Sequence, residues 1–350
     1  MRQVSKNRLK VGPDSAPPAI SIVVIGRNEG LRLAACLESI RRIRGVVVRE
    51  LIYVDSASTD GSPEVALSYG ATVIVVHQER PTAAIGRNAG WLRATSELIL
   101  FLDGDTVLDP GFALAAYKAL APEPSIAAVW GHRREIQPEA SIYNRILDLD
   151  WVYLPGFTEF CGGDVLMRRK VLMETEGFDE RLIAGEEPEL CRRIRSLSYK
   201  ILHTDCPMTG HDLQITRLSQ YWKRATRAGH AYAEVSERFR NTEDPFWSSE
   251  RRRSLIRGGF WIISLAVVLA VSVFVGFLPI ALWLGLLIAL SLRSAWKVRW
   301  KNASLGTLLF YGLHSHLQQI PILVGQLQYE LGKRRNKALK LIEYKQASAD

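Results

Sequence analysis

The chain has 350 residues, of which 47% are hydrophobic and 23% charged, a balance that suits a folded core and excludes a chain disordered throughout. Its four cysteines show no CxxC spacing, which argues against a zinc ribbon or a disulfide scaffold. The net charge is +9, and residues 251–350 carry the excess, with 14 Lys and Arg against 3 Asp and Glu. This distribution argues against nucleic acid as a partner and indicates a basic surface facing anionic lipid.

Residues 1–18 contain basic side chains but no apolar core, so we expect a flexible N-terminus and no signal peptide. The next segments alternate between two patterns. Apolar, β-branched runs predict strands at Ala19–Ile25, Glu50–Val54, Thr72–Val76 and Glu97–Leu102, and helical spacing predicts helices at Leu31–Ile40, Ser62–Tyr69 and Arg87–Ala94. Such alternation predicts an α/β fold with a parallel, doubly wound sheet, which binds ligands at the carboxyl ends of its strands.

Acidic residues follow three of these strands. Glu29 follows the first and Asp55 the second, while Asp103 and Asp105 lie one residue apart directly after the fourth. Two carboxylates on one turn can hold a divalent cation such as Mg²⁺, which fills its shell with substrate phosphates and water. The chain has neither GxGxxG after the first strand nor a GxxxxGK[ST] loop, so an ordinary dinucleotide fold and a P-loop NTPase are excluded.

Several ordered segments resemble one family. SIVVIGRNEG, LIYVDSASTDGS, AAIGRNAG, LILFLDGDT and GFDERLIAGEEPELCRRI, spread over about residues 20–235, are similar to family 2 glycosyltransferases. The resemblance implies the GT-A fold, a Rossmann-like and mainly parallel sheet, over residues 19–240. It also implies transfer of a sugar from a nucleotide-sugar to a hydroxyl with inversion, using Mg²⁺ or Mn²⁺.

The resemblance assigns residues to the donor and the metal. Glu29 and Asp55 would contact the base and ribose of the donor, Arg87 would contact its pyrophosphate or sugar, and Asp164 would bind a sugar hydroxyl. Asp103 would lie near the ribose and the metal, and Asp105 would bind the metal directly. His211 would bind the metal once the donor is bound. Local alternatives stay open for three of them. Arg87 could pair with Glu97 on the surface, Asp164 could belong to a plain turn, and His211 could have a structural role.

An inverting displacement needs a general base opposite the leaving group. The resemblance implies that this base lies at Glu186-Glu187, where the family usually has Glu-Asp. Either glutamate could serve, and we favour Glu187. The alternative is that Gly185-Glu186-Glu187-Pro188 merely begins a helix, with carboxylates at its positive end and proline in its first turn.

Residues 258–292 contain no charged side chain, a run of 35 that is too long for one crossing and somewhat short for two. A break at residues 276–279 predicts a transmembrane or re-entrant hairpin, with arms Phe260–Val275 and Ile280–Leu292, after a basic linker at 241–257. Basic residues flank both ends, which places both on the cytoplasmic side. In residues 293–350 we expect an interfacial helix over Leu305–Val324, rather than a third crossing, and a basic tail.

These features together predict a membrane-associated glycosyltransferase of a bacterial inner membrane, with a cytoplasmic catalytic domain and a lipid-linked or glycan acceptor. A polyprenyl-phosphate sugar synthase, which attacks with a phosphate oxygen, and a catalytically weak nucleotide-binding scaffold are the alternatives. A basic and aromatic cluster at residues 217–224 could bind a diphosphate or form an amphipathic helix on the membrane.

Overall fold

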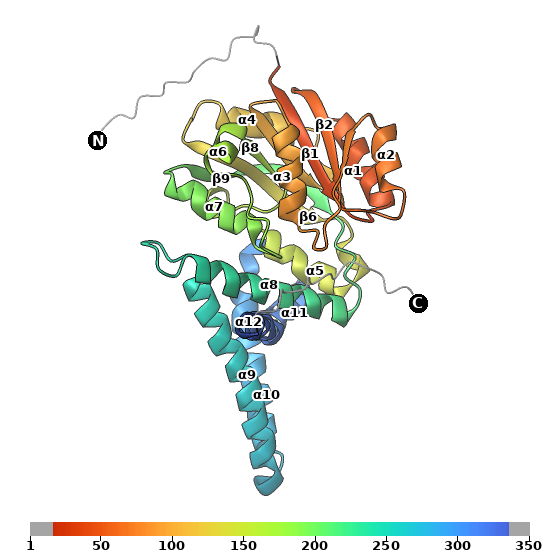
Figure 1. Ribbon diagram of the computed structural model, residues 1–350. Coiled ribbons are helices and arrows are strands. Elements are labelled where there is room, and N and C mark those ends of the chain that lie inside the picture. The colour runs from red at the N-terminus through yellow and green to blue at the C-terminus, as the bar shows by residue number, and fades with distance from the viewer. Residues whose placement is uncertain (1–16, 336–350) are drawn as a thin grey trace, which may run out of the picture.

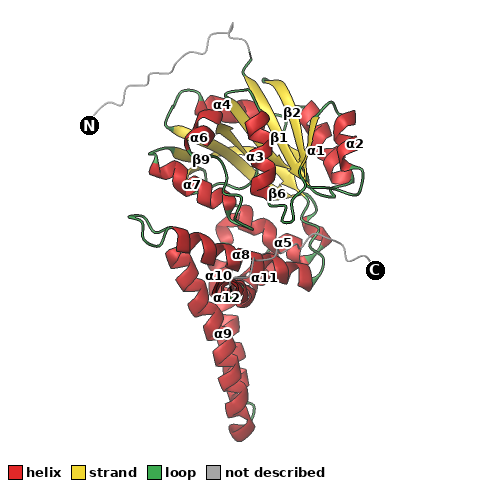
Figure 2. Ribbon diagram, in the orientation of Figure 1, coloured by secondary structure: helices red, strands yellow, loops and turns green. Residues whose placement is uncertain are grey.

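The computed structural model describes residues 17–335, so most of the expected N-terminal lead-in and the end of the basic tail lie outside the described residues. An α/β domain forms one end of the molecule, and two long helices project from it as a hairpin (Figure 1). All the strands belong to the α/β domain, whereas the remainder is helical (Figure 2).

One sheet of nine strands forms the centre of the domain. Its strands are β1 (Ala19–Gly26), β2 (Val47–Asp55), β3 (Thr72–Val75), β4 (Leu98–Asp103), β5 (Thr106–Leu108), β6 (Ile126–Glu135), β7 (Gly156–Thr158), β8 (Val165–Arg168) and β9 (Lys200–His211). The order is β3-β2-β1-β4-β8-β6-β9-β5, with β7 paired to β9. The first four strands in this order are parallel, as the sequence predicts. Beyond β4 the sheet is mixed, because β8 is antiparallel to both β4 and β6 while β6 and β9 are parallel.

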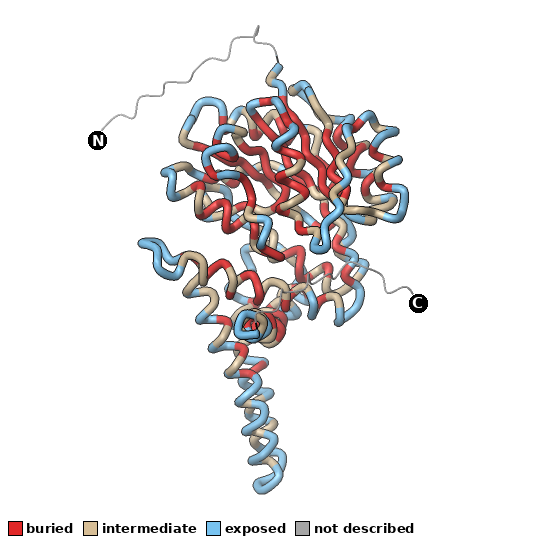
Figure 3. The backbone as a smooth tube through the Cα atoms, in the orientation of Figure 1, coloured by how far each residue is buried: buried red, intermediate tan, exposed pale blue. Residues whose placement is uncertain are grey.

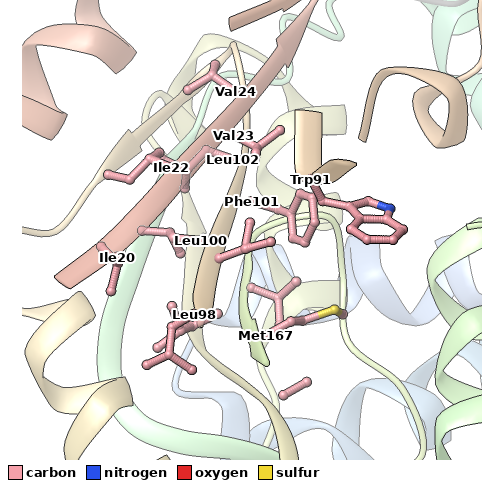
Figure 4. Close-up of a cluster of buried hydrophobic side chains, with 14 of the residues drawn as sticks. Ile20, Ile22, Val23, Val24, Trp91, Leu98, Leu100, Phe101, Leu102 and Met167 are labelled. Carbon is pink, nitrogen blue, oxygen red and sulfur yellow. The ribbon is translucent and has the colours of Figure 1, made fainter. Parts of the chain in front are cut away.

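The core lies along β1 and β4, which are the apolar runs of the sequence. The side chains of Ile22, Val23, Leu100 and Phe101 are fully buried, and Trp91 lies beside them (Figure 4). Strands with both faces covered read as continuous apolar runs, which is why these two were recognisable. The neighbouring strands carry their acidic residues at one edge, where Ile25 pairs with Asp103 and Gly26 with Asp55.

Short helices surround the sheet. They are α1 (Leu31–Arg41), α2 (Ser62–Ser68), α3 (Ala83–Arg93), α4 (Phe112–Leu120), α5 (Ile142–Asp148), α6 (Arg169–Glu174) and α7 (Glu186–Ser196), with 3₁₀ turns η1 (Pro138–Ala140) and η2 (Leu149–Trp151). The helix α3 begins four residues before the predicted Arg87–Ala94. It packs directly on β1, since a Cβ at Gly90 would lie 2.2 Å from Val23 Cγ1. This glycine therefore lets α3 lie close enough for Arg87 to reach the strand ends.

Five further helices and one 3₁₀ turn follow the α/β domain: α8 (Leu218–Arg238), α9 (Ser248–Val275), α10 (Leu278–Lys297), η3 (Arg299–Lys301), α11 (Leu305–Leu317) and α12 (Gln319–Arg334). The helix α9 begins inside the expected linker at 241–257. The break comes where the sequence places it, because Gly276 has a φ of 82° and Pro279 lies in the first turn of α10. The expected interfacial helix is two helices, α11 and α12, which meet at Gln318.

Two helices are long and apolar enough to cross a membrane. The most apolar windows of α9 and α10 have mean hydropathies of 2.4 and 1.8, and 11% of each window is buried. A core helix would be mostly buried, whereas this hairpin exposes its apolar side chains along most of its length (Figure 3). Within residues 17–335 no third helix meets the same criteria of length and hydropathy.

The hairpin is joined to the α/β domain through α8 and α12. These helices cross at glycines on both sides: a Cβ at Gly229 would lie 1.9 Å from the Ile322 carbonyl oxygen, and one at Gly325 would lie 1.9 Å from that of Thr226. The helix α12, seen nearly end-on in Figure 1, also packs on α9 through Gly258, where a Cβ would lie 2.5 Å from the Gln319 carbonyl oxygen. Close backbone approach thus fixes the base of the hairpin against α8 and α12, which connect it to the α/β domain.

Candidate active site

Three ligand-type side chains converge at the edge of the sheet. Asp103 ends β4, Asp105 lies in the turn that follows, and His211 ends β9; one ligand atom of each lies within 4.8 Å of the others. The strands explain the meeting, because β5 pairs antiparallel with β9 and places Thr106 opposite His211. Asp105 and His211 are buried, with 3.4 Å between Oδ2 and Nε2. The sequence prediction of these three as metal ligands is thus compatible with their geometry.

The surroundings of His211 suit a ligand role. Burial and the nearby Arg133 hold the pKa of the imidazole well below its usual range, so the ring is neutral and keeps a lone pair for a metal. Its Nδ1 is buried and has no hydrogen-bond partner among the described residues. The ring packs on Trp151 of η2, with centroids 4.9 Å apart. The two carboxylates suit Mg²⁺ or Mn²⁺, and the neutral imidazole adds a nitrogen ligand that suits a transition metal such as Mn²⁺.

Arg87 joins the metal candidates to the base candidates. Its guanidinium, with 3% of the side chain exposed, lies 2.9 Å from Asp103 and 3.1 Å from each of Glu186 and Glu187. Three carboxylates around one buried cation raise the pKa of Arg87, so it stays charged. The surface pairing with Glu97 is therefore wrong, since Arg87 points inward from α3. The pyrophosphate role stays a prediction.

Glu186 and Glu187 open α7, directly after Gly185, whose φ of 84° turns the chain into the helix. The two carboxylates differ in access: the side chain of Glu186 is 5% exposed and that of Glu187 is 16% exposed. Burial and the adjacent Glu186 raise the pKa of Glu187 to about 7. A more accessible carboxylate with a raised pKa is the better proton acceptor, so the geometry favours Glu187.

Asp164 is fully buried and its two oxygens are occupied by protein groups. Oδ1 accepts the Asp103 N–H at 2.9 Å, while Oδ2 accepts the Thr209 hydroxyl at 2.8 Å and Arg133 Nη2 at 2.6 Å. These bonds fix the positions of Asp103 and Arg133. Asp164 lies in the bend that precedes β8 and is closed to solvent, so its geometry favours a positioning role, and its contact with a sugar hydroxyl stays a prediction. The preceding Gly163 leaves room for the pair of Arg87 and Asp103, which a Cβ there would contact.

Glu29 and Asp55 lie at the same edge of the sheet. Asp55 is fully buried and accepts hydrogen bonds from the Tyr53 hydroxyl at 3.0 Å and from the Ser58 N–H at 2.7 Å, so it closes the turn after β2. Glu29 pairs with Arg32 at 2.9 Å. Their contacts with the base and ribose stay predictions.

Sequence reasoning missed Arg133. This residue of β6 donates to Asp164 and Asp103, and its guanidinium lies 5.4 Å from the centroid of the Trp151 ring. The signal was present in VWGHRRE, where two arginines end an apolar run, but no strand was expected there. Only the pairing of β6 with β8 and β9 brings this side chain to the acidic edge.

Comparison with known proteins identifies the domain. Residues 21–175 match the family model of glycosyl transferase family 2. The chain carries a glycosyl transferase family 2 domain. In sequence it is 34% identical over 98 residues to EpsH of Bacillus subtilis, a protein named as a glycosyltransferase. It is also 24% identical over 246 residues to the pre-mycofactocin glycosyltransferase of Mycobacterium tuberculosis. The alignments cover 27% and 65% of this chain and span 28% and 50% of those relatives, at most half their length.

The fold of the chain also matches a solved structure over most of its length. The mannosyltransferase PcManGT from Pyrobaculum calidifontis, solved with GDP-Man and Mn²⁺, superposes with a TM-score of 0.66 at 20% identity. The match covers 94% of this chain and 92% of that one. At this identity the likeness shows a shared GT-A fold, and its extent means that the C-terminal helices belong to the common architecture.

Proposed function

We propose that this chain is a membrane-associated, inverting glycosyltransferase that moves a sugar from a nucleotide-sugar to a hydroxyl of a membrane-held acceptor, such as a polyprenyl-linked saccharide. One observation carries the proposal: Arg87 joins the cluster of Asp103, Asp105 and His211 to the carboxylate pair Glu186 and Glu187. Leaving-group stabilisation and proton removal, the two demands of inverting transfer, thus have candidate groups side by side.

Each residue has a role in this proposal. Asp103, Asp105 and His211 would hold Mg²⁺ or Mn²⁺, which when bound neutralises charge on the departing nucleotide. Glu187 takes the proton from the acceptor hydroxyl. Arg87 forms ion pairs with both Glu187 and Asp103 and so fixes their relative positions. Asp164 orients Asp103 by accepting a hydrogen bond from its backbone N–H.

The membrane part of the proposal rests on the hairpin. The helices α9 and α10 meet the length and hydropathy of membrane-crossing helices, and the uncharged run of 35 residues that they share forms the part within the membrane. The basic residues that flank the apolar run, among them Arg293, Lys297 and Arg299, would lie at the cytoplasmic face against anionic lipid. This orientation puts the active site on the side where nucleotide-sugars are made, and we propose a bacterial inner membrane as the location.

The test is transfer by purified protein in detergent. UDP-, GDP- and dTDP-sugars are screened with Mn²⁺ or Mg²⁺, with and without a polyprenyl-phosphate acceptor. We expect metal-dependent nucleotide release from one donor, absent in Asp105→Ala and strongly reduced in Glu187→Gln. If Glu187→Gln transfers sugar to the lipid phosphate at the normal rate, the acceptor group is a phosphate oxygen and not a hydroxyl, and the proposal changes accordingly. Absence of both turnover and nucleotide-sugar binding would refute the enzyme function, whereas binding of a nucleotide-sugar without turnover would favour the scaffold.

A further inference from the structure

A cavity of about 470 Å³ lies where the α/β domain meets the base of the hairpin. It is lined by residues of α8, α9, α11 and α12 and by the segment around η2. Its volume lies within the range of about 300–1,000 Å³ that small-molecule sites occupy. The cavity is separate from the metal cluster, and none of the roles proposed above uses it.

The lining of the cavity contains more basic than acidic side chains. Four cationic side chains line it: Arg224, Arg253, Arg257 and Lys301. The lining includes two carboxylates, of which Glu250 pairs with Arg253 at 3.2 Å. The other, Asp150, accepts the Tyr311 hydroxyl at 2.9 Å and lies 3.6 Å from His314 Nε2.

Two of the cations remain available to a ligand. Within residues 17–335, Arg224 and Arg257 form no ion pair and no hydrogen bond through their side chains, although they line the same cavity as Lys301. Lys301 Nζ donates to the Leu149 carbonyl and retains two further N–H donors. Arg224 is half-buried and Arg257 is exposed, and the guanidinium groups of both can bind an anion that enters the cavity.

The cavity adjoins the active site through a single turn. In η2, Trp151 packs on His211 and Arg133, whereas the preceding Asp150 lines the cavity. A group bound in the cavity therefore lies one 3₁₀ turn from the metal candidates. On its other side the cavity is bounded by α9, whose apolar part begins at Gly258, directly after Arg257.

We propose that this cavity binds the phosphate or diphosphate group of the lipid-linked acceptor. Arg224, Arg257 and Lys301 contact the phosphate oxygens, the lipid chain leaves along α9, and the acceptor group points past η2 towards Glu187. The inference rests on the proposed function, which it deepens by naming the anionic group that anchors the acceptor. A neutral lipid would offer these cations no charged oxygen to bind.

The test measures binding of a radiolabelled polyprenyl phosphate in detergent micelles to wild-type protein and to Arg224→Ala, Lys301→Ala and Arg252→Ala. Arg252 is the matched control, because it is an exposed arginine of α9 that does not line the cavity. Each cavity substitution should weaken binding about tenfold or more, since a hydrogen bond to a charged group contributes about 1.5–3 kcal/mol. Arg252→Ala should bind like wild type. Size-exclusion profiles show which variants are folded.

Three results would overturn the proposal: unchanged binding in both cavity variants, an equal loss in Arg252→Ala, or competition by free pyrophosphate that equals competition by the lipid. The second would assign binding to the general basic surface, and the third to a soluble anion. Nucleotide-sugar binding by wild-type protein is measured without lipid. If it fails while lipid binding still depends on the cavity, the proposed function falls and the anionic site stands.

Discussion

The space at Gly163 offers a sharp test of the candidate site. A Cβ built there would lie 2.2 Å from Arg87 Nη2 and 3.0 Å from each carboxylate oxygen of Asp103. Ordinary contact begins at 3.4 Å, so in Gly163→Ala the guanidinium must move by 3.4 − 2.2 = 1.2 Å. Its hydrogen bonds to Asp103 and Glu186 are 2.9 and 3.1 Å long, and such a move stretches at least one beyond the usual limit of about 3.2 Å.

The expected cost follows from that broken bond. A hydrogen bond between charged groups is worth about 1.5–3 kcal/mol, and each kcal/mol lowers the melting temperature of a domain of this size by about 2–4 °C. We therefore expect Gly163→Ala to melt about 3–12 °C below wild type. We also expect it to gain less stability from Mn²⁺, because Asp103 is displaced with Arg87.

The matched control is the neighbouring glycine. A Cβ at Gly162 would meet only Arg133 Nη1, at 3.8 Å, which is ordinary contact. Thermal unfolding is followed by tryptophan fluorescence in detergent at one scan rate, with and without Mn²⁺, for Gly162→Ala and Gly163→Ala. Equal melting temperatures and equal Mn²⁺ effects in the two variants would refute the tight packing of Arg87 against Asp103.

Three further predictions concern the base, the metal and the helix crossing. The pKa of Glu187 is raised to about 7, so below that pH most of its carboxyl groups are protonated and cannot accept a proton. We therefore expect kcat to rise as the pH increases through about 7. A kcat that does not change with pH would contradict Glu187 as the base. Chelator should lower the melting temperature of Mn²⁺-loaded wild type but not of Asp105→Asn; an equal drop in both would remove Asp105 from the ligands. Gly229→Ala should loosen the packing of the hairpin base and speed proteolysis between α8 and α9, because the added Cβ would lie 1.9 Å from the Ile322 carbonyl oxygen. The control is Gly259→Ala, which has open space around it and should be cut at the same rate as wild type.

Much of the first half of the fold could be predicted because its signals are local. Strands β1 and β4 are buried on both faces and therefore read as continuous apolar runs, and Gly276 and Pro279 mark the hairpin break directly. The second half of the sheet gave weaker signals. Strand β6 was not predicted, because its second part, His132 to Glu135, is polar and interrupts the apolar pattern with which the strand begins. The antiparallel strand β8 is too short to show a period.

The candidate site divides in the same way. The motif residues Asp103, Asp105 and Glu187 are recognisable because their spacing within one turn or one helix start is part of their chemistry. Arg133 and Lys301 were not, because their partners are distant in the chain: Asp103 is 30 residues from Arg133, and Leu149 is 152 residues from Lys301. The hydrophobic periodicity of a segment predicts its own helix or strand, but it does not predict which distant segment that element contacts.

The sequence by itself determined the α/β class, the acidic strand ends, the family resemblance and the two apolar arms, because each of these depends on residues close together in the chain. Only the tertiary structure decided that Arg87 faces inward to three carboxylates, that Asp164 supports Asp103 instead of facing solvent, and that basic residues of α8, α9 and η3 enclose one cavity. The physical reason is that burial and ion pairing depend on which elements pack together, and packing is settled by the whole core at once.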